Sequence, residues 1–249
     1  MKGVFVSDCE GPISKNDNAF ELTAHYVPEG DRLFSIISKY DDILVDVLKK
    51  RGYNAGDTLK LILPFLKANE VTDEKMKEFS ARTLLLISGS KETLKHITSI
   101  TNAFIVSTSY EHYIRALCEI VGFPFENTYC TKLSIDKYEI SLEEKIKLRK
   151  TAYEIASMPM ITIPHSATSV KDFSARDQES IRRLDEIFWA EIPQMCCRKI
   201  FSDVVTVGGE QKAEAIRQII KKLGATLAGS IYVGDSITDI EAFQLVRDS

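Results

Sequence analysis

Short apolar runs alternate with longer amphipathic stretches over much of the chain. The runs that predict strands are residues 4–7, 103–106, 128–133, 204–207 and 231–233. Runs this short and rich in β-branched residues are typical of strands that are buried on both faces of a parallel sheet. Their alternation with helical stretches predicts an α/β fold with a Rossmann-like parallel sheet.

Apolar residues at helical spacing predict the helices. We expect helices over residues 31–50, 57–66, 72–82, 91–100, 110–121, 141–158, 174–192, 210–223 and 239–246. Gly52, Gly122 and Gly224 each follow the end of one of these stretches, as glycine often does after a helix. Pro64 is expected to interrupt the second helix, because proline removes a backbone donor. Ser141 and Glu144 have the spacing of a capping box at the start of residues 141–158.

Two long segments interrupt the alternation of strands and helices. Residues 13–83 follow the first strand and are helical in pattern, and residues 136–199 contain two more helices without a clear strand. We therefore expect a catalytic core made of residues 1–12, 84–135 and 200–249. The segment 13–83 is expected to form a helical cap, and 136–199 a second inserted helical segment. A chain of 249 residues is long enough for this arrangement.

Composition and charge exclude several other classes of protein. Hydrophobic residues make up 44% and charged residues 27%, which is ordinary for a soluble protein. The net charge of −4 gives no broad attraction to nucleic acid. No apolar stretch approaches the roughly 18 residues that cross a bilayer, so membrane insertion is not expected. The five cysteines have no regular spacing, which favours reduced thiols in a cytoplasmic protein over a disulfide framework.

Acidic residues follow the first and the last predicted strands. Asp8 and Glu10 come after the first strand, and Asp235 and Asp239 after the last. Ligands of parallel α/β sheets bind at the carboxyl ends of the strands, so these side chains are expected to meet there. Such a cluster of carboxylates is costly unless a cation neutralises it, and Mg²⁺ prefers hard oxygen ligands. This pattern points to phosphoryl chemistry.

Two further polar residues occupy comparable positions. Ser107 ends the second strand, and Lys212 lies near the start of the helix after the fourth. Ser107 could bind a phosphoryl oxygen together with N–H groups of the next helix, or it could simply cap that helix. Lys212 could provide positive charge for a phosphate, or it could be an exposed helix lysine. Asp239 could equally be a helix cap.

Taken in order, these residues resemble the four motifs of the haloacid dehalogenase superfamily, most of whose members are Mg²⁺-dependent phosphatases. The matching residues are Asp8-Cys9-Glu10, Ser107, Lys212 and Gly234-Asp235-Ser236-Ile237-Thr238-Asp239. The turn that contains Ser107 and Thr108, and the long early helical insertion, look most like the phosphoserine-phosphatase-like branch. A group of uncharacterised archaeal predicted phosphatases is a weaker resemblance.

The resemblance implies a role for each matched residue. Asp8 would be the nucleophile and a metal ligand, and Glu10 the general acid and base, with its backbone carbonyl on the metal. Ser107 and Thr108 would bind the phosphate, and Lys212 would neutralise it. Asp235 would bind Mg²⁺, and Asp239 would support Lys212 or a metal-bound water.

Glu10 departs from this family pattern, which has aspartate two residues after the nucleophile. The extra methylene lengthens the side chain by about 1.5 Å, roughly one bond length. We expect a Mg²⁺-dependent phosphomonoesterase that hydrolyses a small phosphorylated metabolite through an aspartyl-phosphate. A catalytically weak protein kept for binding or assembly, and a phosphotransferase, remain as alternatives. The sequence indicates neither the substrate nor a protein partner.

Overall fold

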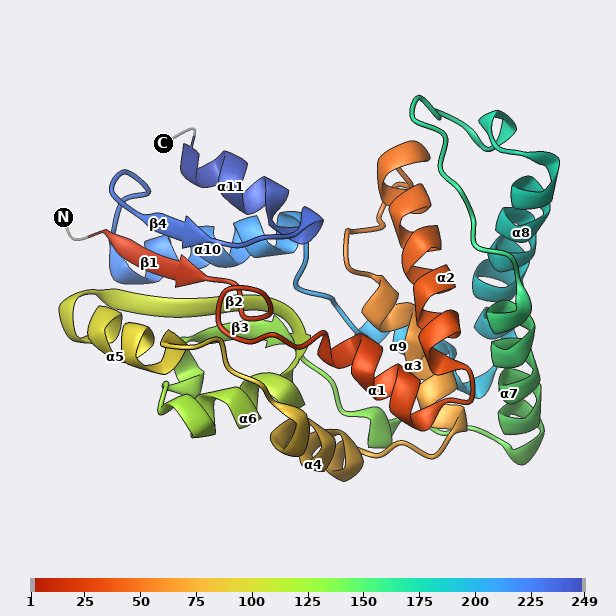
Figure 1. Ribbon diagram of the computed structural model, residues 1–249, viewed down its shortest axis with the longest axis horizontal. Coiled ribbons are helices and arrows are strands. Elements are labelled where there is room, and N and C mark those ends of the chain that lie inside the picture. The colour runs from red at the N-terminus through yellow and green to blue at the C-terminus, as the bar shows by residue number, and fades with distance from the viewer. Residues whose placement is uncertain (1–2, 248–249) are drawn as a thin grey trace. The chain divides into compact units, whose positions relative to one another are not determined.

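The computed structural model describes residues 3–247, which divide into two compact units (Figure 1). The first unit comprises the described residues of Met1–Asn18, Glu74–Leu133 and Val205–Ser249, and the second comprises Ala19–Asp73 and Ser134–Val204. Each unit is therefore assembled from segments that lie far apart in the sequence.

A four-stranded parallel sheet forms the centre of the first unit. Its strands are β1 (Val4–Ser7), β2 (Asn102–Tyr110), β3 (Thr128–Thr131) and β4 (Ile231–Val233), in the order β3-β2-β1-β4. Because β1 lies between β2 and β4, the residues that follow these strands meet at one edge of the sheet (Figure 1). The predicted α/β fold is confirmed, as are the strands expected at 4–7, 103–106, 128–133 and 231–233.

Helices cover both faces of this sheet. The first unit contains α4 (Asp73–Thr83), α5 (Ser90–Ile100), α6 (Glu111–Val121), α10 (Glu210–Leu223) and α11 (Ile240–Arg247). On one face, Ile105 of β2 shares an apolar cluster with Leu94 of α5 and Leu117 of α6. On the other face, Val106 packs in a cluster with Ile216 of α10. Adjacent residues of β2 therefore point into opposite cores, as the period of a strand requires.

The strand predicted at residues 204–207 is wrong. Val204–Val207 belongs to no strand, and side-chain hydroxyls make its contacts instead. Val207 N donates to Thr131 Oγ1 over 3.1 Å, and Thr108 Oγ1 donates to Val207 O over 3.0 Å. Its β-branched composition favours a strand, but these contacts come from threonine hydroxyls rather than from a neighbouring backbone.

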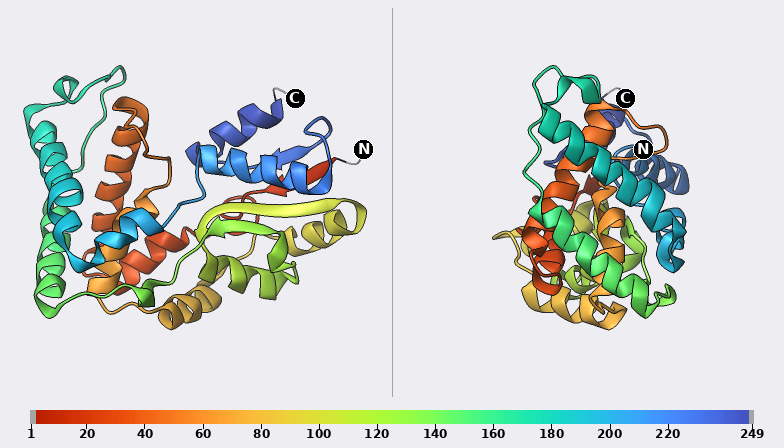
Figure 2. Two further views of the ribbon diagram at one scale, coloured as in Figure 1. Left: turned by 180° about the vertical axis from the view of Figure 1, so that it is seen from behind. Right: turned by 90° about the vertical axis from the view of Figure 1, so that its right-hand side faces the viewer.

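The second unit is helical (Figure 2). It contains α1 (Asn18–Tyr26), α2 (Gly30–Asp42), α3 (Thr58–Ala68), α7 (Leu142–Ser157), α8 (Ala175–Glu186) and α9 (Lys199–Asp203). The helices α2, α3 and α7 pack against one another. Two of the predicted helices change character near their ends, since α2 continues as the π-helical segment Ile43–Val47 and α8 as Ile187–Glu191.

Pro64 does not interrupt its helix, so the predicted break is wrong. Helix α3 runs through Pro64 from Thr58 to Ala68. Leu61, Ile62, Leu63, Phe65 and Leu66 are fully buried around it. Burial of such side chains contributes about 1.5–3 kcal/mol each, so the five together outweigh the roughly 3 kcal/mol cost of one internal proline. By contrast, the capping box of Ser141 and Glu144 is confirmed at the start of α7.

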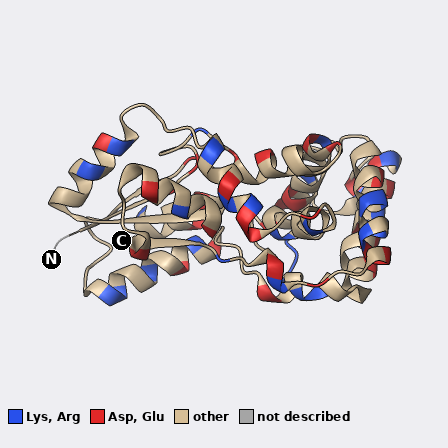
Figure 3. Ribbon diagram, turned by 90° about the horizontal axis from the view of Figure 1, so that it is seen from below, with Lys and Arg blue, Asp and Glu red and all other residues tan. Residues whose placement is uncertain are grey.

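Charged side chains of both signs are distributed over the helices of each unit (Figure 3). Within residues 3–247, none of the helices combines the length and the apolar character that crossing a membrane requires.

Candidate active site

Asp8 lies directly after β1 at the edge of the sheet where β1 and β4 end. The residue is 5% exposed, and its backbone N donates to Val233 O over 2.8 Å. Cys9 N donates to Asp8 Oδ1 over 2.6 Å, which fixes the carboxylate against the loop that follows. Asp8 is thus a buried carboxylate whose position is set by the pairing of β1 with β4.

Gly11 allows the loop after Asp8 to pass close to Asp235. Its φ is +94°, and a Cβ built there would lie 2.0 Å from Asp235 Oδ2. A side chain at this position would therefore be strained by the backbone and would also displace the Asp235 carboxylate.

Lys212 connects the two ends of the chain at this site. Its ammonium donates to Asp8 Oδ2 and to Asp239 Oδ1, over 2.6 Å in each case, and its side chain is 0% exposed. The start of α10 is held in place by Gly209, whose N donates to Thr238 O over 2.9 Å in the loop after β4. Lys212 is therefore not the exposed helix lysine that the sequence left open.

Asp239 uses both carboxylate oxygens within the protein. Oδ1 accepts from Lys212 and from the Tyr232 hydroxyl. Oδ2 accepts from the backbone N of Asp235 (3.1 Å) and Ser236 (2.9 Å), and from Ser236 Oγ (3.1 Å). The bond from Ser236 N, together with the Ser236 side chain accepting from the Asp239 backbone, forms a capping box for a short 3₁₀ turn. Asp239 therefore caps this turn and supports Lys212 at the same time.

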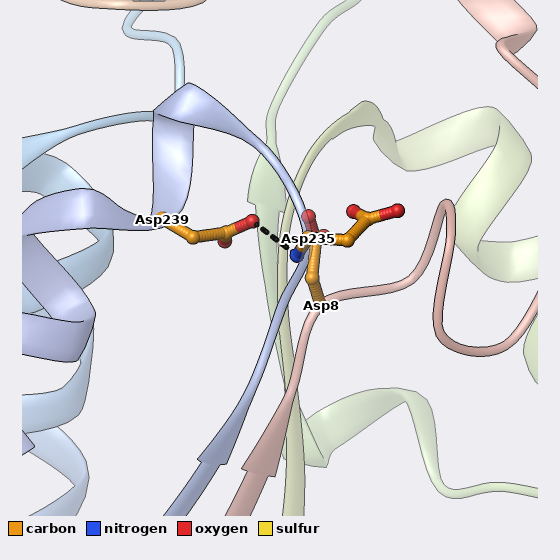
Figure 4. A group of neighbouring side chains, drawn as sticks. All are labelled: Asp8, Asp235 and Asp239. Atoms are coloured by element: carbon orange, nitrogen blue, oxygen red, sulfur yellow. Dashed lines mark hydrogen bonds between the residues drawn. The ribbon is translucent and has the colours of Figure 1, made fainter.

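Three carboxylates lie close together here (Figure 4). One oxygen from each of Asp8, Asp235 and Asp239 lies within 4.8 Å of the other two. Both oxygens of the Asp239 carboxylate accept hydrogen bonds from the protein, whereas Asp235 is exposed and the Asp8 carboxylate accepts only from Lys212 and Cys9 among the described residues. These hard oxygen donors fit Mg²⁺, and Asp8 and Asp235 are the side chains that would hold it.

The electrostatics of the site follow from burial and from Lys212. Burial raises the pKa of Asp8 above its ordinary value, against the opposing effect of the Lys212 ammonium. Burial also acts to raise the pKa of Asp239, but Lys212 and the hydrogen bonds to its carboxylate lower it below its ordinary value. Burial alone would lower the pKa of Lys212, yet the two aspartates raise it, so the lysine stays charged.

Glu10 lies on the loop after Asp8, and its carboxyl group accepts hydrogen bonds from Asn18 and Ser109. Glu10 Oε1 accepts from Asn18 N over 2.7 Å. Burial raises the pKa of Glu10 to about 8, although the hydrogen bonds from Asn18 and Ser109 oppose the shift. This raised pKa favours the protonated Glu10 carboxyl at neutral pH, which is the form that a general acid needs.

Ser107 and Thr108 lie in an irregular part of β2. The register of the pairing between β2 and β3 shifts between Ser107 and Tyr110. Bulges of this kind are common next to active sites, where they change the direction of a side chain. Ser107 Oγ is buried, lies 3.1 Å from Ser109 Oγ and accepts from Ser109 N. The N-cap of α6 is Tyr110, so Ser107 is not a helix cap. The Thr108 hydroxyl donates to Val207 O, which places it in the link between β2 and α10.

Sequence reasoning missed several residues that build this site. Tyr232 has the appearance of an ordinary core residue in the last strand, but its hydroxyl bonds to Asp239. Gly11 has the positive φ and the close approach described above, and no local pattern indicates either. Ser109 contributes a second hydroxyl beside Ser107, and its position in the same Ser-Thr-Ser run was the available signal.

Comparisons with known proteins give no match by sequence. No family model matches the chain, and no curated protein matches it. Among solved structures, gene product AF1437 from Archaeoglobus fulgidus superposes with a TM-score of 0.82 and 27% identity, over 100% of this chain and 71% of that one.

Two structures of phosphoserine phosphatase also share the fold. The apo form has a TM-score of 0.55 and 13% identity, and a substrate-bound complex has 0.52 and 14%. Each covers 98% of this chain and 83% of the other. These likenesses confirm the predicted fold, and the chain accordingly has the haloacid dehalogenase fold, in the form found in phosphoserine phosphatase.

Proposed function

We propose that this protein is a Mg²⁺-dependent phosphomonoesterase that hydrolyses a small phosphorylated metabolite through an aspartyl-phosphate on Asp8. The observation that carries the proposal is the buried Lys212, whose ammonium bridges Asp8 and Asp239 beside the exposed Asp235. A purely structural ion pair would not need Asp235 as a third carboxylate next to Asp8 and Asp239. A site that binds a phosphate and a divalent cation uses such a carboxylate as a metal ligand.

Charge balance supports this assignment. The three aspartates and Lys212 sum to a formal charge of −2 when all are ionised. A bound Mg²⁺ would neutralise that charge and attract phosphoryl oxygens, which is the electrostatic help that phosphoryl transfer requires. Lys212 would remain as a fixed cation toward the same oxygens.

The first half of the reaction transfers the phosphoryl group to the protein. A carboxylate oxygen of Asp8 attacks phosphorus, a new O–P bond forms, and the bond from phosphorus to the alcohol oxygen breaks. Glu10 donates its proton to the departing oxygen, so the product leaves as a neutral alcohol. Ser107, in the irregular part of β2, would bind the phosphoryl oxygens together with N–H groups at the start of α6.

The second half releases phosphate. Glu10, now ionised, accepts a proton from water, and the oxygen of that water attacks phosphorus. The bond between phosphorus and Asp8 breaks, which restores the Asp8 carboxylate, and the proton taken from water leaves Glu10 protonated for the next turnover. One residue thus acts first as acid and then as base, as microscopic reversibility allows.

Hydrolysis of p-nitrophenyl phosphate in the presence of Mg²⁺ tests the proposal. Wild-type protein should release nitrophenol, removal of Mg²⁺ by a chelator should stop the reaction, and Asp8→Asn should abolish it. Asp235→Asn should raise the Mg²⁺ concentration that half-maximal activity requires, and Asp46→Asn, an exposed aspartate of the second unit, is the matched control. An active Asp8→Asn protein would refute the aspartyl-phosphate.

Glu10→Asp separates hydrolysis from the alternative of a catalytically weak binding protein. A working Glu10 predicts that the shorter side chain reduces the rate, because it no longer meets Asn18 N at the same place. A large gain in rate would instead show that the native glutamate suppresses turnover. Comparing the amounts of alcohol and of free phosphate that are produced distinguishes hydrolysis from phosphotransfer to another acceptor.

A further inference from the structure

A buried polar network lies behind the loop that carries Glu10. It consists of Tyr113 from α6 with Ser14 and Asn16 from the loop, and all three are buried, Tyr113 completely. The Tyr113 hydroxyl oxygen lies 2.7 Å from Ser14 Oγ and 3.1 Å from Asn16 Oδ1. A phenylalanine would fill the same apolar space, so the hydroxyl contributes polar contacts rather than volume.

The network fixes the path of the loop on both sides of these contacts. Ser14 Oγ is 3.8 Å from Cys9 Sγ, and Gly11 N donates to Ser14 O over 2.8 Å, which closes the turn directly after Glu10. Asn16 Nδ2 donates to Thr83 O over 3.0 Å, and Asn16 Oδ1 accepts from Leu85 N over 2.7 Å. The Asn16 side chain therefore contacts Thr83 O, Leu85 N and the Tyr113 hydroxyl.

The same loop then returns to Glu10. Two residues beyond Asn16, the backbone N of Asn18 donates to Glu10 Oε1 over 2.7 Å. Asn18 is itself buried, and its Nδ2 donates to Ser80 Oγ over 3.3 Å. The Glu10 carboxyl is thus oriented by Ser109 and by the backbone N–H of Asn18, and we take the place of that N–H to be set by Asn16 and, through it, by Tyr113.

We propose that Tyr113 is a positioning residue for Glu10, acting through Ser14 and Asn16. The inference rests on the proposed function, because Glu10 needs a fixed direction only if it transfers a proton to the leaving oxygen. A carboxyl group one methylene longer than the aspartate of the family pattern has more freedom to rotate, and the Tyr113 network restricts that freedom.

The leaving group provides a selective test. An alkyl phosphate such as glycerol 2-phosphate needs a proton on its departing oxygen, whereas p-nitrophenolate leaves readily without one. Tyr113→Phe should lower kcat/KM for glycerol 2-phosphate roughly ten-fold and for p-nitrophenyl phosphate less than about two-fold. Ser14→Ala, which removes a smaller part of the same network, should shift the two substrates in the same unequal way.

Two controls separate positioning from general damage. Tyr129→Phe removes a tyrosine hydroxyl from β3 that makes no hydrogen bond to residues 3–247, and it should leave both rates unchanged. In a Glu10→Gln background, Tyr113→Phe should have no further effect on glycerol 2-phosphate, because the group it positions is gone. An equal loss on both substrates, or a full additional loss in the Glu10→Gln background, would overturn the proposal.

A measurement that needs no catalysis completes the test. Hydrogen exchange of the Asn18 backbone N–H, followed by NMR, should be about ten-fold faster in Tyr113→Phe than in wild type and unchanged in Tyr129→Phe. Unchanged exchange in Tyr113→Phe overturns the positioning role whether or not the protein is a phosphatase. Inactivity of the wild-type protein with faster exchange would refute the proposed function alone.

Discussion

Lys212→Met is the substitution with the largest expected physical effect on the site. The ammonium of Lys212 is inaccessible to solvent and lies 2.6 Å from both Asp8 Oδ2 and Asp239 Oδ1. Methionine is unbranched and fills most of the space of the lysine side chain, but it leaves the two buried carboxylates without their cation. Removing one partner of a buried ion pair costs about 3–5 kcal/mol, because the remaining charge is no longer compensated. The metal-free variant should therefore be less stable than wild type by about this amount.

The affinity of this variant for Mg²⁺ should rise, although its stability without Mg²⁺ falls. Without the lysine, the formal charge of the three aspartates is −3 rather than −2. A divalent cation then meets more negative charge and no repulsion from the ammonium, so its affinity should rise by roughly ten-fold or more. Activity should nevertheless fall strongly, because the fixed cation toward the phosphoryl oxygens is lost.

Urea unfolding with and without Mg²⁺, together with a calorimetric titration of Mg²⁺, measures both effects. Lys222→Met is the matched control, since Lys222 is exposed near the end of the same helix. The reasoning would be refuted if metal-free Lys212→Met were as stable as wild type, or if its Mg²⁺ affinity were lower.

Two further predictions concern a glycine of the site and a buried acid of the second unit. Gly11→Ala should weaken Mg²⁺ binding at least ten-fold, because the new Cβ would lie 2.0 Å from Asp235 Oδ2. Gly122→Ala, which has a similar positive φ and open space around it, should not, and equal titrations of the two variants would contradict the argument. In the second unit, burial raises the pKa of Asp41 to about 6. The folded state then binds a proton more tightly than the unfolded state, so stability should fall as pH rises from about 4 to about 6 and stay level above that. Asp41→Asn should remove up to about 3 kcal/mol of that fall, measured as the difference between wild-type and variant unfolding free energies at each pH. Parallel pH profiles for the two proteins would contradict this account.

The residues at the strand ends could be predicted to lie together from the sequence alone. Parallel strands bring their carboxyl ends to one edge, so the position of Asp8 and Asp235 follows once β1 and β4 are recognised as strands. Lys212 could be placed near them because it begins the helix that precedes β4. These predictions depend only on local patterns and on one rule of sheet geometry.

Other features depend on contacts that no local pattern encodes. The run Val204–Val207 has the composition of a strand, but hydroxyls of Thr108 and Thr131 make its contacts. The path of α3 through Pro64 depends on burial among helices from distant parts of the chain. The union of residues 19–73 and 134–204 in one unit is equally a long-range property, since the two segments are separated by β2, α6 and β3.

A crystal structure of the protein with Mg²⁺ and beryllium fluoride tests the central claim most directly, because beryllium fluoride bound to a carboxylate mimics an aspartyl-phosphate. The account predicts beryllium fluoride on a carboxylate oxygen of Asp8, with Lys212 beside it and Mg²⁺ held by Asp8 and Asp235. Beryllium fluoride bound elsewhere, or Mg²⁺ bound away from both aspartates, would contradict it.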